Sequence, residues 1–205
     1  MEATQTRNET DAERVLYIEH DGVGLTHQVL AEALAEPGFP VHESKAFVRN
    51  MRAAGYVKPY NRGRADKRSA YLYRPDAALA LGVLLRASDA GFVSQEVRKV
   101  LGLSIQKWRD ADRPGSAGTV PRSPGALILA AYAEGHRNFA ADLAFFRQPG
   151  KREPLIAARY RQEADGMTRG TNFAEETEGL EVGSSWTCPL DQIMAHLMRR
   201  KGAVH

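Results

Sequence analysis

The amino-acid sequence predicts a mainly α-helical fold in which one short β ribbon interrupts a series of helices. Three observations support this prediction. Apolar residues recur at helical spacing over most of the chain, aromatic and β-favouring residues gather at 56–73, and Gly, Pro and Ser gather at 109–125. The 205 residues include 43% hydrophobic and 26% charged residues, a composition ordinary for a globular protein with a buried core.

The N-terminal half is predicted to contain helices on both sides of the ribbon. Thr26 is placed to cap the first helix, and Gly55 and Gly91 stand where helices commonly end. After a polar extension at 1–24, the expected elements are helices at 26–36, about 42–54, 75–91 and 94–103, with the ribbon at about 58–72 between the second and the third helix.

The second of these helices is predicted to be amphipathic, with one side facing the core. Its apolar stripe consists of Ala46, Phe47, Met51 and Ala54. The basic side chains on the opposite side are those of Lys45, Arg49 and Arg52.

The C-terminal half is predicted to be a helical domain, 126–205, joined to the first half by a linker at 109–125. Helices are expected at 126–148, 155–166 and 189–201, and a loop at 170–187. The strongest apolar positions serve either the core of this domain or a dimer interface, and they are Leu127, Phe139, Leu143 and Phe146. The sequence assigns no role to this domain.

Positive charge is concentrated in residues 44–73. This stretch contains eight Lys and Arg residues against the single acid Asp66, and eight bases less one acid give +7. The formal net charge of the whole chain is only +3, so the remaining residues carry about −4. Positive charge concentrated in one segment indicates a polyanionic partner.

Several classes of site are not supported by the sequence. Cys188 is the single cysteine, so one chain can form neither a disulfide framework nor a thiolate metal cluster. The six histidines show no metal-ligand spacing, and no paired carboxylates or catalytic triad stand out. We therefore expect no metal, no cofactor and no enzymatic activity. No signal peptide or membrane-spanning apolar stretch is found, and a cytoplasmic location is expected.

Two segments resemble the MerR family of transcription regulators. "RNMRAAGYVKP" is similar to the end of that family's recognition helix, where Arg49 and Gly55 fall on the family's Arg and Gly. The segment 73–101 is similar to the part after the family's wing, and it matches without a gap at Tyr73, Gly91, Phe92, Val97 and Leu101. The resemblance covers about residues 25–103.

The sequence also departs from the family's pattern. Asn50 and Met51 stand where the family has two aromatic residues, and Tyr71 stands where a wing Arg is common. The linker at 109–125 interrupts the position of the long helix through which family members usually dimerise.

The resemblance implies a winged helix-turn-helix DNA-binding domain at 25–108, with a recognition helix at about 42–54 and a basic wing at about 58–72. It implies a bacterial or phage regulator of transcription that binds double-stranded DNA as a homodimer, with RNA polymerase as a further partner. The expected DNA-binding residues are Ser44, Lys45, Arg49, Arg52, Lys58, Arg62, Arg64, Lys67, Arg68 and Tyr71. The alternative is a DNA-architectural or accessory protein of a phage or mobile element, such as an excision or packaging factor.

Overall fold

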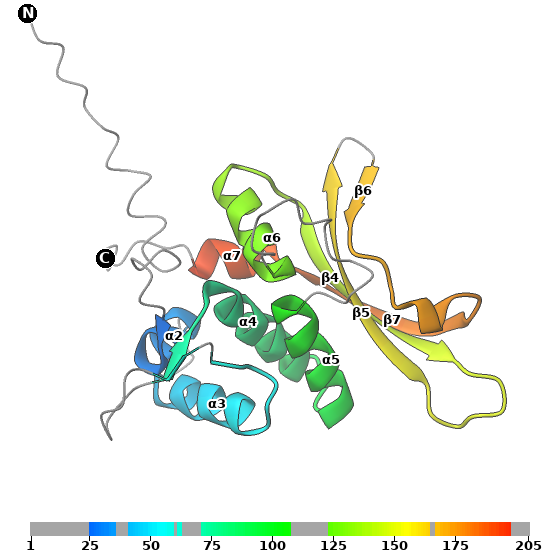
Figure 1. Ribbon diagram of the computed structural model, residues 1–205, viewed down its shortest axis with the longest axis horizontal. Coiled ribbons are helices and arrows are strands. Elements are labelled where there is room, and N and C mark those ends of the chain that lie inside the picture. Colours follow the sequence, from blue (N-terminus) through cyan, green and yellow to red (C-terminus); the bar gives the residue numbers. More distant parts are fainter. Residues whose placement is uncertain are drawn as a thin grey trace, which may run out of the picture.

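A computed structural model describes the chain over residues 25–35, 41–59, 61–62, 71–107, 123–164 and 167–197. Figure 1 shows helices on the left and in the centre, and a twisted sheet on the right. In chain order the elements are β1 (Leu25–Thr26), α2 (His27–Leu34), α3 (Val41–Ala53), β2 (Asn61–Arg62), β3 (Tyr71–Tyr73), α4 (Pro75–Asp89), α5 (Gln95–Gln106), α6 (Pro124–Ala133), β4 (Phe139–Arg147), β5 (Leu155–Ala164), β6 (Met167–Gly170), the 3-10 helix η2 (Glu175–Thr177), β7 (Glu181–Pro189) and α7 (Asp191–Leu197).

The prediction of a mainly α-helical chain with a helical C-terminal region is wrong, because the fold is mixed α and β. The C-terminal half contains a four-stranded antiparallel sheet in the order β6-β5-β4-β7. Two of the expected helices contain β4 and β5, and the expected loop at 170–187 contains most of β7. The helices α6 and α7 lie where helices were predicted, and Ser123 at the end of the expected linker caps α6.

The strands were mistaken for helices because their sequences lack the alternation that marks a half-exposed strand. β4 is paired on both sides, and nearly all of its residues are buried on both faces of the sheet. A short run that is buried on both faces cannot be distinguished from a buried helix by periodicity. The Ala and Leu residues of β4 and β5 also favour helices locally, and sheet pairing overrides that preference.

The N-terminal half follows the predicted order of helices. The Thr26 side chain accepts a hydrogen bond from the Val29 amide at 3.3 Å and caps α2. Gly55 has a φ of +77°, which is the left-handed conformation that glycine tolerates at a helix end. The small sheet has three strands, not the predicted two, because β1 pairs with β3 alongside β2.

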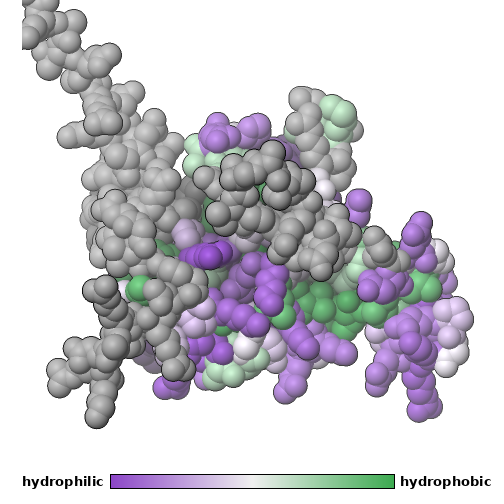
Figure 2. Space-filling model, viewed as in Figure 1, coloured by the Kyte–Doolittle hydropathy of each residue, from purple (hydrophilic) through white to green (hydrophobic). Residues whose placement is uncertain are grey.

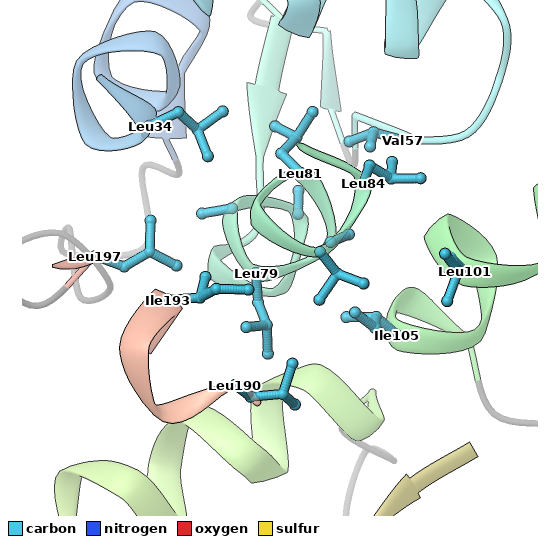
Figure 3. Packing of buried hydrophobic residues seen from close by; sticks show 14 of the residues in the cluster. Leu34, Val57, Leu79, Leu81, Leu84, Leu101, Ile105, Leu190, Ile193 and Leu197 are labelled. Carbon is cyan, nitrogen blue, oxygen red and sulfur yellow. The ribbon is translucent and has the colours of Figure 1, made fainter. Parts of the chain in front are cut away.

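One hydrophobic core joins the two halves of the chain. Figure 3 shows Leu79, Leu81 and Leu84 of α4 at its centre. Around them lie side chains of α2, the loop after α3, α5 and the C-terminal region, among them Leu34, Val57, Leu101, Ile105, Leu190, Ile193 and Leu197. A Cβ atom at Gly82 of α4 would collide with Ile193 of α7, so the two helices are packed very closely. Side chains of the C-terminal region therefore form part of the same hydrophobic core as the N-terminal helices.

Candidate nucleic-acid interface

Helix α3 leaves its basic residues Lys45 and Arg49 exposed. Its buried residues are Ser44, Val48 and Met51, spaced four and three residues apart along one stripe. Lys45 and Arg49 are one helical turn apart and both are exposed. Two cationic side chains thus project from the same part of the helix surface.

The apolar stripe of α3 is rotated relative to the one predicted. Met51 is buried as expected, but Ala46 and Phe47 are only half-buried and Ala54 is exposed. Ser44 is fully buried with 0% exposure, so it belongs to the inward side of α3 and not to the exposed basic surface.

Arg52 and Tyr71 hold α3 and β3 together. The guanidinium carbon of Arg52 lies 4.2 Å from the centre of the Tyr71 ring, within the range of a cation–π interaction. Both residues are half-buried. Next to them Tyr73 is fully buried, and burial raises its pKa while the nearby Arg52 acts in the opposite direction. Arg52 thus positions the wing strand on α3, which leaves less of its charge available to a ligand.

The chain leaving α3 is fixed by the far end of α5. The side-chain oxygen of Gln106 accepts a hydrogen bond from the Lys58 amide at 3.0 Å, and its side-chain nitrogen donates to the Tyr56 carbonyl at 3.0 Å. Gly102 lies against the same carbonyl, and a Cβ atom there would collide with it. Lys58 itself is exposed, at the start of the expected wing.

Gln106 and Gly102 were not among the predicted site residues. Gln106 is 48 residues from Lys58 in the sequence, and no local pattern links the two. A second contact of this kind joins α2 and α3, where the imidazole of His27 donates from Nε2 to the Lys45 carbonyl at 3.0 Å.

The remaining predicted wing residues are described only in part. Arg62 belongs to β2, which pairs with β3, but its side chain is outside the described residues. Arg64, Lys67 and Arg68 also lie outside them. The described part of the interface therefore consists of the exposed face of α3, Lys58 and the backbone pairing of β2 with β3.

The C-terminal sheet carries its own polar cluster around Asp142, a buried residue in the middle of β4. Arg159 and Arg161 donate to Asp142 Oδ2 at 3.0 and 2.7 Å, and Thr187 donates to Oδ1 at 2.8 Å. Burial alone would raise the pKa of Asp142, but the hydrogen bonds from Arg161, Thr187 and Arg159 outweigh it and hold the pKa below its usual value. The cluster ties three strands together.

The thiol of Cys188 is not activated. Cys188 is buried, and burial raises the pKa of its thiol to about 11, far from that of an activated thiolate. Within the described stretches, no three His, Cys, Asp or Glu side chains gather in a way that could hold a metal ion. No helix in the same stretches is long and apolar enough to cross a membrane.

Comparisons of the chain with protein-family models, with curated proteins and with solved structures find no match. Function is therefore inferred from the residues and geometry of the chain itself.

Proposed function

We propose that this protein is a sequence-specific regulator of transcription that binds duplex DNA through a winged helix-turn-helix. In this proposal α3 enters the major groove and the wing lies along the adjacent backbone. The resemblance of residues 25–103 to the MerR family supports the same assignment.

The observation that carries the proposal is the exposed pair Lys45 and Arg49 on α3. Both are exposed on a part of the helix surface that flanks the stripe α3 buries with Val48 and Met51. A helix that is held by its apolar side and exposes cations beside it matches the geometry of a recognition helix. Arg side chains read guanine in the major groove, and Lys and Arg both bind phosphates.

The surroundings of α3 are suited to holding it rigidly against a ligand. His27 fixes the start of the helix, Gln106 fixes its exit, and Arg52 fixes the neighbouring strand. A reading helix gains specificity when its supporting contacts prevent it from shifting.

Selection of bound sequences from a randomised pool of duplexes tests the proposal, using the full-length chain. We expect a defined sequence motif to be enriched. Recovery of duplexes without any motif would reduce the function to non-specific binding, and no binding at low salt would overturn it.

Mapping of occupied sites in the genome then tests the regulatory role. A regulator is expected to occupy a few promoters. Sites clustered within one mobile element would instead assign the protein to the accessory factors that excise or package such elements.

A further inference from the structure

The strand β7 forms one edge of the C-terminal sheet in the part of the chain that the structure describes. Among the described residues it pairs only with β4, so its other side presents unpaired backbone N–H and C=O groups. Seven of its nine residues are exposed. The opposite edge of the sheet is the much shorter β6, with four residues.

This edge lacks most of the devices by which proteins prevent strands from pairing with other chains. Such devices include charged side chains, prolines within the strand and bulges. Between Val182 and Cys188 the strand contains no charged residue and no proline. One register irregularity falls opposite Phe145 and Phe146, and from Ser184 onward the ladder with β4 is regular. No described strand pairs with the outer side of the segment from Ser184 to Cys188, which can therefore accept another strand.

Apolar surface continues from this edge onto the neighbouring face of the sheet. The ring of Phe92, in the loop after α4, lies 6.0 Å from Phe145 and 5.4 Å from Trp186 of β7, measured between centroids. All three rings are half-buried, and Val93 beside them is 58% exposed. Figure 2 shows hydrophobic residues gathered over the strands beside α5. A partner docked on β7 would cover part of this surface.

We infer that β7 pairs in antiparallel fashion with β7 of a second copy of this chain. The two four-stranded sheets then form one continuous sheet of eight strands across a two-fold axis. Charge favours a second copy as the occupant. In an antiparallel pair of β7 strands, residues of this segment lie opposite residues of the same segment in the second copy, so like charges in it would repel one another. Ser184–Cys188 carries no charge, so no such repulsion arises.

This interface replaces the one that the sequence predicted at 126–146. Phe139, Leu143 and Phe146 are buried in the core of their own chain, with exposures of 5%, 0% and 4%, so they cannot form a surface for a partner. Of the four predicted positions only Leu127 is exposed, at 40%. The pairing of β7 does not depend on the proposed function. If both hold, one particle carries two α3 helices, as two half-sites on DNA require.

Sedimentation of the full-length chain over a range of concentrations tests this inference. We expect a dimer for the wild type and a shift to monomer for Ser185→Lys, because the substitution places two like charges near the two-fold axis. Met167→Lys is the matched control, since Met167 is 55% exposed on β6 at the other edge of the sheet. A monomeric wild type overturns the inference, and so does dissociation by Met167→Lys with Ser185→Lys still dimeric.

Hydrogen exchange on the wild-type chain decides the question even if Ser185→Lys fails to fold. The β7 amides that point away from β4 are expected to exchange slowly at concentrations where the chain is dimeric and quickly where it is monomeric. Equal exchange of these amides at both concentrations contradicts pairing through β7. Neither experiment contains DNA, so failure here leaves the proposed function to be tested separately.

Discussion

The hydroxyl of Tyr160 on β5 lies 2.6 Å from the hydroxyl of Ser104 on α5. The same Tyr160 hydroxyl lies 3.3 Å from the Leu101 carbonyl, and the ring is 3% exposed. This contact joins the C-terminal sheet to α5, the last helix of the N-terminal half. The two halves should therefore unfold together.

We expect Tyr160→Phe to lower the free energy of unfolding by about 1 kcal/mol, because it removes a buried hydroxyl with two partners. Urea unfolding followed by Trp fluorescence and by circular dichroism measures this. The control is Tyr132→Phe, which keeps the ring that lies 4.0 Å from the Arg137 guanidinium and should change little. Separate transitions for the two probes would show that the halves unfold independently.

The clamp that Gln106 forms on the exit from α3 gives a second prediction. Gln106→Leu removes the hydrogen bonds to Tyr56 and Lys58, so the base of the wing should lose its fixed position. We expect a loss of about 1 kcal/mol in folding stability and a weaker affinity for all duplexes.

Gln95→Leu at the opposite end of α5 is the matched control, because Gln95 is exposed there. Both variants are compared by fluorescence anisotropy on a labelled duplex. If the two variants bind DNA with equal affinity, Gln106 contributes to the stability of the fold and not to DNA binding.

The hydrogen bonds that Asp142 accepts predict that the folding stability of the chain decreases at acid pH. Because the pKa of Asp142 is lower in the folded chain than in the unfolded chain, the folded state binds fewer protons. Its stabilising contribution is complete above the unfolded pKa, about 4, and is lost as the pH falls through the folded pKa.

Asp142→Asn should therefore cost about 1–3 kcal/mol at pH 7 and should flatten the loss of stability below about pH 4. Thermal or urea unfolding between neutral and acid pH provides the measurement. Glu181→Gln is the control, because its ion pair with Arg147 spans 3.8 Å between exposed side chains and contributes little. A variant as acid-sensitive as the wild type would exclude Asp142 as the titrating group.

The wing gives a prediction that rests on its sequence. Arg64 and Lys67 stand in the basic segment between β2 and β3, where phosphate contacts are expected. Either change to Ala should weaken binding to selected and random duplexes alike. It should also reduce the slope of log affinity against log salt by about one. A loss confined to the selected duplex would assign base reading to the wing.

Local signals explain why the N-terminal half was predicted well. The Thr26 cap and the glycines after α3 and α4 each act over a few residues, and the structure confirms them. The position of Ser44 was mistaken because one helical turn holds few apolar residues from which to locate the stripe. Lys45 and Arg49 are exposed as expected.

Long-range pairing explains why the C-terminal half was predicted poorly. Thr187 contacts Asp142 across 45 residues, and Tyr160 contacts Ser104 across 56. No local window contains both members of such a pair. The same strand β4 also buries Asp142 among Ala, Leu and Phe residues, where arginines from β5 neutralise its charge.

The central claim is that α3 reads DNA, and it is tested most directly by the affinities of Lys45→Ala and Arg49→Ala for a selected duplex and for random duplexes. The full-length chain is needed because the two halves share a core. Lys151→Ala, in the exposed turn between β4 and β5, is the control. We predict a loss of about 1–3 kcal/mol on the selected duplex, little loss on random DNA and no effect of Lys151→Ala. Unchanged affinity of both α3 variants for the selected duplex would contradict the claim.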